Sequence, residues 1–239
     1  MADKLLDVND LTVSVEEKEI LHDINLSINK GETHVLMGPN GAGKSTLGFA
    51  LMGSPKYTLN SGEILFNGKN INDETPDKRS KDGIFLSFQS PLEVPGLSLS
   101  SFIRNALEKN RGKRIRLWDF KKELREAMEL LQMDPSYSER DLNVGFSGGE
   151  KKKSRNFADA FTQSKACNYL TKQTRALMLM RFAQFQRALN IDQKNRRRCI
   201  AHHHTQQQVF SNLSKLINTH IMVNGHIVKT GDASLIRNQ

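Results

Sequence analysis

Short apolar runs recur through the first third of the 239-residue chain, and their lengths predict β-strands rather than helices. Some of them alternate in part between apolar and polar positions, which is typical of strands with one buried face. Others are more continuously apolar, which favours strands buried on both faces. The runs that predict strands are residues 5–8, 11–15, 20–28, 33–37, 62–68 (a strand that ends in a turn) and 84–88.

The pattern changes to helical spacing after Pro91 and Pro95, which interrupt the chain beyond the last of these strands. Residues 98–109 are predicted to form one helix, and Asp119 is a predicted N-cap for a second. We interpret the basic residues 111–116 between the two helices as a solvent-exposed loop. The apolar positions of the second helix, spaced as one buried face requires, are Phe120, Leu124, Met128 and Leu131.

A glycine-rich stretch follows the predicted strand at residues 33–37 and matches the pattern G-x-x-x-x-G-K-[ST] of a phosphate-binding P-loop. Its backbone N–H groups are expected to surround an anion, aided by the positive end of the following helix. Lys44 is predicted to reach the β- and γ-phosphates of a nucleotide, and the Ser45 hydroxyl to ligate Mg²⁺. The stretch consists of Gly38, Pro39, Asn40, Gly41, Ala42, Gly43, Lys44, Ser45 and Thr46.

Composition narrows the class of protein further. No apolar run approaches ~18 residues, so we expect no membrane span, and the first residues lack a signal-peptide pattern. Cys167 and Cys199 have no metal-like spacing, which makes a reducing, cytoplasmic compartment the default expectation. The net charge of +9 comes from residues 151–198, which hold 13 Lys and Arg against 2 Asp and Glu. Because the excess lies in one segment, we do not take it as a sign of a nucleic-acid partner.

A second anion-binding turn is predicted at residues 147–150, which read Ser-Gly-Gly-Glu and open a helix. Gln89 lies between the two turns, at the end of a predicted strand. The chain thereby resembles the ABC-type ATPases, and the strings that carry the resemblance are GPNGAGKST, FQSPLEVPGLS, NVGFSGGEKKK and VNGHIVKTGD. The second and third strings favour the SufC family, the ATPases of the SUF iron–sulfur cluster assembly system. The resemblance covers residues 1–153 and about 219–235.

The resemblance implies roles for several residues. Gln89 would join Ser45 at Mg²⁺ and sense the γ-phosphate. Ser147, Gly148 and Gly149 would form a signature that binds the γ-phosphate held by the P-loop of a second subunit. ATP would then lie between two head-to-tail subunits, and the implied partners are the SufB and SufD scaffold proteins.

Residues 154–218 depart from the family pattern. ABC-type ATPases have here an apolar strand that ends in Asp-Glu, whose carboxylates support Mg²⁺ and polarise the attacking water. The only acidic residues in this segment are Asp159 and Asp192, and neither has an acidic neighbour. We therefore assign no intact catalytic residue. Residues 202–204 are three adjacent histidines, but neighbouring side chains of an extended chain point to alternate sides, so we predict no metal site.

A change of reading frame would account for the departure. Suitable codons for residues 154–168, read one nucleotide later, give VEILQMLLLNPKLA. Codons for residues 170–180, read two nucleotides later, give DETDSGFDVD, which resembles the missing carboxylates and the loop after them. Codons for residues 201–205, read one nucleotide later, give LIIT. We interpret the segment as translated out of frame, with divergence as the alternative, and the coding DNA across residues 150–222 distinguishes the two.

This interpretation has a physical consequence. The family places a buried strand beside the P-loop strand, and residues 167–173 are too polar for a central strand buried on both faces. We therefore expect that position in the sheet to be poorly filled, and residues 154–218 to be less ordered than residues 1–150.

The predicted fold is α/β: a P-loop ATPase core in a single domain, 1–239, with an antiparallel β subdomain and a helical subdomain at about residues 90–150. The predicted function is ATP binding that drives an iron–sulfur scaffold, with impaired hydrolysis. Two alternatives remain open. One is the ATPase subunit of a membrane transporter. The other is a non-catalytic basic binding module that uses residues 151–198, which salt-dependent binding of RNA or DNA would reveal.

Overall fold

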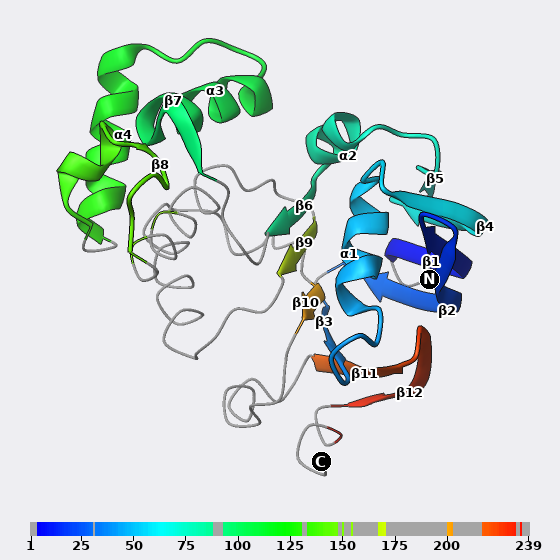
Figure 1. The fold of residues 1–239 in the computed structure, drawn as a ribbon. Coiled ribbons are helices and arrows are strands. Elements are labelled where there is room, and N and C mark those ends of the chain that lie inside the picture. The colour runs from blue at the N-terminus through cyan, green and yellow to red at the C-terminus, as the bar shows by residue number, and fades with distance from the viewer. Residues whose placement is uncertain are drawn as a thin grey trace. The chain divides into compact units, whose positions relative to one another are not determined.

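The computed structural model describes residues 4–30, 32–87, 93–130, 133–147, 150, 154, 167–170, 200–202, 217–232 and 235. These residues form two compact units, drawn as ribbons in Figure 1. The first unit contains residues 4–87 together with the described residues from 167 onward. The second contains the described residues 93–154, within which the helical subdomain predicted at about 90–150 falls.

The first unit contains a four-stranded antiparallel sheet in the order β2-β1-β4-β5. The predicted runs 5–8 and 11–15 belong to one continuous strand, because an irregularity in the pairing between Val8 and Leu11 shifts the register without ending the strand. The strands are β1 (Lys4–Val15), β2 (Lys18–Asn29), β4 (Tyr57–Phe66) and β5 (Lys69–Asn70).

A six-stranded sheet in the order β12-β11-β3-β10-β9-β6 forms the other layer of the first unit. All neighbours in it pair in parallel except β11 and β12, which form an antiparallel hairpin. The strand that leads into the glycine-rich loop therefore lies inside the sheet, with a neighbour on each side. The strands are β3 (Thr33–Met37), β6 (Ile84–Ser87), β9 (Cys167–Leu170), β10 (Ile200–His202), β11 (Ile217–Val223) and β12 (His226–Asp232).

Within the polar stretch predicted to lie beside the P-loop strand, the described residues 167–170 lie elsewhere in the sheet, so that expectation is wrong for them. The neighbours of β3 are β10 and β11, while β9 pairs with β6 on one side and β10 on the other. Strand β9 fills the position between β6 and β10 with its backbone. Any extended segment can do so, because it satisfies the N–H and C=O groups that the two neighbouring strands would otherwise leave unpaired. Apart from 154, 167–170, 200–202 and 217–218, residues 154–218 lie outside the described residues, and the expected difference in order stays a prediction.

Helix α1 (Lys44–Met52) packs its apolar residues into one hydrophobic core shared by the two sheets. The core takes side chains from β1, β2, β3, β4 and β6, and Figure 1 shows α1 beside these strands. Burial of these side chains is the main favourable term for the unit, at roughly 25 cal/mol per Å² of apolar surface. Core residues close to the helix include Leu21, Leu36, Leu47, Ala50, Leu51 and Ile64.

A buried arginine from helix α2 (Pro76–Asp82) fixes the C-terminal end of α1. The Arg79 side chain is only 1% exposed, and its guanidinium Nη1 donates to the carbonyls of Ala50 (2.9 Å) and Leu51 (3.0 Å). Further donations go to the carbonyls of Glu74 and Asn72. The last carbonyls of a helix have no partner within it, and a cation there also opposes the negative end of the helix dipole.

The second unit is built on two amphipathic helices, α3 (Leu99–Arg111) and α4 (Leu117–Leu130), with the 3₁₀ helix η1 (Pro135–Ser138) and the short strands β7 (Val94–Ser98) and β8 (Asp141–Leu142). Ser98 is the N-cap of α3, and its Oγ accepts the N–H of Ser101. The predicted N-cap at Asp119 is wrong: α4 begins at Leu117, and the Phe120 N–H already bonds to the carbonyl of Arg116. Asp119 therefore lies in the first turn, where its charge favours the positive end of the helix. The core of the unit contains Leu99, Ile103, Leu107, Phe120, Leu124 and Met128.

A chain of buried hydrogen bonds links β3, β11 and β12 at the end of β3 away from the glycine-rich loop. His34 Nδ1 and His220 Nε2 are 2.8 Å apart, and the outer nitrogens lie 3.1 Å from a Glu32 carboxylate oxygen and 2.9 Å from the Thr230 hydroxyl. Only one proton fits between two facing ring nitrogens, so neutral imidazoles satisfy the chain: Thr230 donates to His220, His220 to His34, and His34 to Glu32. Burial lowers the pKa of His34 and lowers that of His220 to about 4.

We predict that this unit loses stability as the pH falls from about 6.5 to about 4. The unfolded histidines bind protons below their ordinary pKa of 6.5, while folded His220 stays neutral until about pH 4 and burial also lowers the pKa of His34, so protons favour unfolding in this window. His220 alone accounts for roughly 3 kcal/mol over the whole window. Chemical denaturation at several pH values measures the slope. His220→Gln should reduce it, and His226→Gln, at an exposed position, should leave it unchanged.

Candidate nucleotide-binding site

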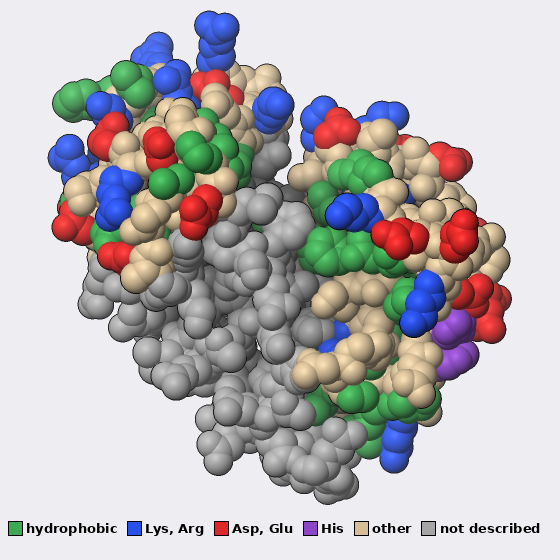
Figure 2. Space-filling model, viewed as in Figure 1, with side chains coloured by type: hydrophobic (Ala, Val, Ile, Leu, Met, Phe, Trp, Pro, Cys, Tyr) green, Lys and Arg blue, Asp and Glu red, His purple; other side chains and the backbone are tan. Residues whose placement is uncertain are grey.

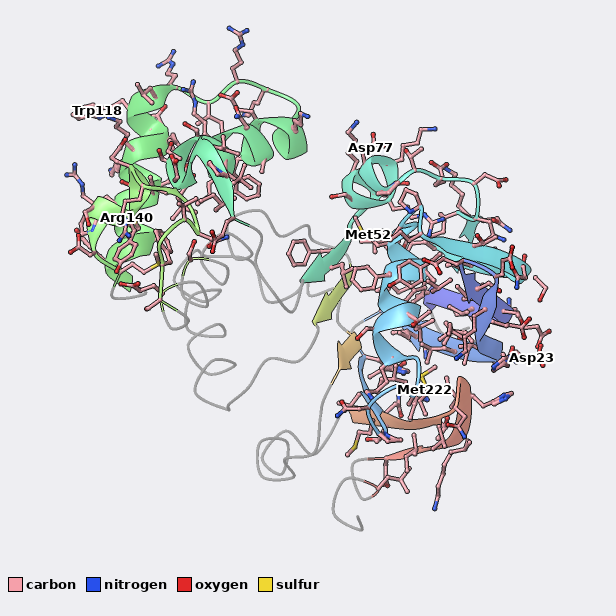
Figure 3. The ribbon with its side chains drawn as sticks, viewed as in Figure 1. Asp23, Met52, Asp77, Trp118, Arg140 and Met222 are labelled. Atoms are coloured by element: carbon pink, nitrogen blue, oxygen red, sulfur yellow. The ribbon has the colours of Figure 1, made fainter. Side chains whose placement is uncertain are left out.

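The glycine-rich loop spans the six residues between the end of β3 at Met37 and the start of α1 at Lys44. Strand, loop and helix follow one another as the sequence predicts. The parallel strand points its carboxyl end at the loop, and α1 points its N-terminus into the same place, which is where α/β proteins bind ligands. Figure 3 labels Met222 of β11, whose neighbour Ile221 pairs with Met37 just before the loop.

Gly38, the first residue of the loop, lies against the backbone of β11. A Cβ atom at this position would stand 2.0 Å from the carbonyl oxygen of Met222, and the residue has φ of +145°. No other amino acid fits without moving either the loop or the strand. The close approach of Gly38 to β11 therefore fixes where the loop starts.

The turn between β11 and β12 supports the loop from the other side. Asn224 and Gly225 both have positive φ, as a tight Asn-Gly hairpin turn requires. The Gly225 N–H donates to the carbonyl of Ala42 (3.1 Å), and the Gly225 carbonyl accepts the N–H of His22 (3.0 Å). A hairpin near the end of the chain thus connects the loop to β2, a contact that the local P-loop pattern does not contain.

Lys44 is folded back into the loop. Its side chain is only 4% exposed, and Nζ donates to the carbonyls of Gly38 (2.8 Å) and Pro39 (2.5 Å). A buried ammonium group needs such partners, because removing a charge from water without them costs several kcal/mol. These two carbonyls place a positive charge inside the concave side of the loop.

The N-terminus of α1 has the features of an anion site. Gly43 is its N-cap in a left-handed conformation, no side chain caps it among the described residues, and its first turn contains no acidic residue. Ser45 and Thr46 are half-buried in that first turn, while Pro39, Asn40 and Gly41 are exposed. The space around Gly41 is open, with no atom within 4 Å of a Cβ built there. The arrangement fits phosphate groups, with Lys44 beside them and the Ser45 hydroxyl as the candidate Mg²⁺ ligand.

The second predicted anion site lies in the second unit and is a helix N-terminus with a capping box. The Ser147 N–H donates to Glu150 Oε2 (2.6 Å), and the Glu150 N–H donates to Ser147 Oγ (3.3 Å). The Tyr137 hydroxyl donates to the other carboxylate oxygen of Glu150. These bonds, with that of Tyr137 the largest cause, lower the pKa of Glu150 to about 2.

An arginine and two aromatic rings surround this cap. The Tyr137 and Phe146 rings meet edge to face with their centroids 5.0 Å apart. Arg140, labelled in Figure 3, places its guanidinium carbon 4.5 Å from the centroid of Phe146 and 5.0 Å from that of Tyr137. Cation–π attraction of this kind fixes the arginine near the ionised Glu150. Sequence reasoning missed Tyr137 and Arg140, because their contacts with the capping residues depend on the η1 turn.

The described residues account for part of the predicted site. Gly38 to Gly43 form the loop, Lys44, Ser45 and Thr46 begin α1, and Ser147 forms the capping box of the second turn with Glu150. Gln89, Gly148 and Gly149 lie outside the described residues, so their predicted roles stay predictions. No group of three or more His, Cys, Asp or Glu able to hold a metal ion occurs in the described part of the chain. No helix that the structure describes is long and apolar enough to cross a membrane.

A lysine enclosed by a glycine-rich loop, between a parallel strand and a helix N-terminus, defines a P-loop nucleotide-binding protein of α/β fold. The model of the ABC transporter family matches residues 21–170. The chain belongs to this family, as an ATP-binding subunit of the ABC type.

Similar proteins include the "probable ATP-dependent transporter ycf16" of Pyropia yezoensis, 39% identical over 98% of this chain and 94% of that protein. "Vegetative protein 296" of Bacillus subtilis strain 168 is 37% identical over 98% of this chain and 90% of its own length. Among solved structures, an ATP-binding cassette in a dimeric post-hydrolysis state bound to ADP and Pi has a TM-score of 0.77 at 17% identity, covering 96% of this chain and 99% of that one. At that identity the likeness shows the fold alone, and it confirms the predicted α/β cassette with its antiparallel sheet.

We predict that Tyr137→Phe raises the pKa of Glu150 from about 2 towards the ordinary value of a glutamate, because the hydroxyl is the largest cause of the shift. A depressed carboxyl pKa stabilises the fold above the unfolded pKa, and this contribution is lost as the pH falls from about 4.5 to about 2. The variant should therefore show a smaller loss of stability in that window. NMR titration of the Glu150 carboxyl measures the shift directly. Tyr57→Phe, in the first unit, is the control and should change nothing at Glu150.

Proposed function

We propose that this chain binds ATP and Mg²⁺ at the P-loop and serves as the ATPase subunit of a SUF-type iron–sulfur cluster assembly system. The observation that carries the nucleotide site is the buried ammonium group of Lys44, held by the carbonyls of Gly38 and Pro39 at an otherwise uncapped helix N-terminus. Phosphate oxygens are better partners for an ammonium group than carbonyls, since a hydrogen bond between two charged groups is stronger.

The residues of the loop have separate tasks. Backbone N–H groups around Gly41 and Gly43 bind phosphate oxygens, and Lys44 neutralises the β- and γ-phosphates. Ser45 would supply its hydroxyl oxygen as a ligand for Mg²⁺, and Gln89 would supply its side-chain amide oxygen as another. The bound metal ion supplies charge neutralisation at the transferred phosphoryl group. Gly38 and Gly225 act by fixing the loop against β11 and β2.

The signature turn would complete the site from a second subunit. Glu150 and Tyr137 orient the N-terminus at which Ser147, Gly148 and Gly149 would meet the γ-phosphate. Two observations support this head-to-tail arrangement. The family match includes the turn, and related cassettes at low identity have been solved as dimers, one of them with ADP and Pi.

The SUF assignment rests on two strings whose described residues, 93–98 and 143–147 with 150, belong to the second unit. Gly96, from the string FQSPLEVPGLS, donates its N–H to Asp141 Oδ2 (2.9 Å), and Leu99 donates to the carbonyl of Arg140 (3.0 Å). Strand β7 of the first string pairs with β8, which leads into NVGFSGGEKKK. The string FQSPLEVPGLS thus pairs with the strand that leads directly into the other string, which supports one shared surface for SufB and SufD, in the cytoplasm.

Similarity to a probable ATP-dependent transporter favours a second candidate, the ATPase subunit of a membrane transporter. Purified SufB and SufD from a related organism, mixed with this chain, should form a complex that elutes as one species on size exclusion. If no such complex forms and the chain instead binds a purified permease, the result would support the transporter function. Binding of nucleotide alone does not separate the two candidates.

Replacing Lys44 by Ala should weaken nucleotide binding by about 10- to 100-fold, the range expected for losing a hydrogen-bonded charge worth ~1.5–3 kcal/mol. Calorimetry with Mg-ATP measures the affinity, and Lys56→Ala, an exposed lysine beyond α1, is the control. Equal affinities for Lys44→Ala and the unaltered chain would show that the loop does not bind nucleotide as proposed.

Turnover should be far below that of ordinary family members. In residues 154–218 no Asp-Glu pair is present to polarise water or support the metal ion. Loss of a positioned base alone costs ~10²–10⁴ in rate. Steady-state phosphate release measures the turnover rate, and the Lys44→Ala variant gives the background rate. Activity at the usual level of the family, abolished in Lys44→Ala, would contradict this prediction.

A further inference from the structure

Exposed hydrophobic side chains gather where α3 and α4 join. Three large hydrophobic side chains of the described residues are exposed, and two of them are neighbours: Leu117 (53%) and Trp118 (82%), at the start of α4. In Figure 3 the labelled Trp118 points away from the second unit. Two residues along a helix lie about 200° apart, which is why Trp118 is outside while Phe120 enters the core.

Basic side chains surround this pair. Residues 109–122 contain seven Lys and Arg and one acidic residue, Asp119. On α4, Lys121 and Lys122 stand three and four residues after Trp118, and are therefore its neighbours on the helix surface. Figure 2 shows Lys and Arg, with some Asp and Glu among them, around hydrophobic side chains at this end of the unit. The exposed cations are Lys109, Lys113, Arg114, Arg116, Lys121, Lys122 and Arg125.

Hydrogen bonds hold the backbone of the loop that carries Lys113, Arg114 and Arg116 between α3 and α4. The Glu108 carboxylate accepts the N–H of Ile115 (3.0 Å) and pairs with Arg104 (3.2 Å), whose guanidinium also donates to the Ile115 carbonyl. Ile115 is buried, and Gly112 ends α3 in a left-handed conformation. The bond from Ile115 is the largest cause of the lowered pKa of Glu108. The charged side chains on either side of Ile115 are thus presented from an ordered turn.

We propose that this surface, residues 109–122 with Arg125, binds reversibly to an anionic membrane, with Trp118 inserted at the level of the lipid headgroups. Tryptophan prefers the membrane–water interface, where its ring is apolar and its N–H is hydrated. Lysine and arginine beside it attract acidic headgroups through long, flexible side chains. The proposal does not depend on the SUF assignment or on nucleotide binding.

The size of the apolar part favours a membrane over a protein. A stable protein interface buries about 800 Å² on each partner around an apolar core. Two side chains on one helical turn are too few for such a core, but they suffice as an interfacial anchor when basic groups supply the rest of the attraction. A single-stranded nucleic acid would use several aromatic side chains along a groove, and this surface has one.

Trp118 is the only tryptophan of the chain, so its fluorescence reports on this surface alone. The full chain is mixed with vesicles of phosphatidylglycerol and phosphatidylcholine, and with vesicles of phosphatidylcholine alone. We expect the emission to shift to shorter wavelengths with the anionic vesicles only. Sedimentation with the vesicles should give the same partition coefficient. A salt concentration of 1 M should release the protein, because electrostatic attraction is then screened beyond ~3 Å.

The double variant Lys121→Glu, Lys122→Glu keeps Trp118 and tests the charges. It should lower the partition coefficient at least about 25-fold, since each basic group near an anionic surface is worth about fivefold. The matched control Lys18→Glu, Lys56→Glu makes the same change of charge at exposed positions in the first unit and should bind nearly as the unaltered chain does. Circular dichroism and Mg-ATP affinity show that each variant folds.

Three results would overturn the proposal. The first is absence of binding to anionic vesicles at low salt. The second is vesicle binding without a change in Trp118 emission, or with equal loss in both double variants. The third is a Trp118 response to polyglutamate or single-stranded RNA, but not to vesicles, which would assign the surface to an acidic protein or a nucleic acid instead.

Discussion

The close approach of Gly38 to the carbonyl of Met222 is the constraint on which the nucleotide site depends. A Cβ at this residue would come within 2.0 Å of the oxygen, so the loop can lie on β11 only with glycine there. Gly225, bonded to Ala42 and His22, supports the loop from the hairpin that follows β11. The shape that encloses Lys44 is therefore set by backbone packing between distant segments. Substitutions in β11 or its hairpin should matter to nucleotide binding without touching the nucleotide.

Local signals predicted much of this arrangement. The P-loop pattern between an apolar strand and an apolar helix located residues 38–46, because strand, turn and helix N-terminus are encoded in consecutive residues. The capping box of Ser147 and Glu150 is equally local. The N-cap was predicted wrongly at Asp119, because propensity identifies residue types that favour an N-cap but not the residue at which the helix begins. The hydrogen bond from the Phe120 N–H to the Arg116 carbonyl shows that α4 begins before Asp119.

Other features have no local signal. Arg79 stands in a polar helix, and nothing nearby in the sequence indicates that its guanidinium is buried against the carbonyls of α1. The same holds for Tyr137, whose partner Glu150 is reached only through the η1 turn. The sheet order was also misjudged. The polar composition of the segment that contains residues 167–170 predicts a poor strand, but the strands that these residues join are decided by the backbone positions left open between β6 and β10.

The histidine pair has a consequence for the order of events during synthesis. His34 and His220 are 186 positions apart in the chain, and β3 pairs with β11 along its whole length. At roughly 5–20 residues per second, the ribosome takes on the order of ten to forty seconds to make the second partner after the first. During the same interval the glycine-rich loop lacks β11 and the hairpin after it, which determine its shape. A nascent chain thus carries its phosphate-binding residues long before it has a phosphate-binding site, and in that interval chaperones, rather than nucleotide, have the first opportunity to bind it.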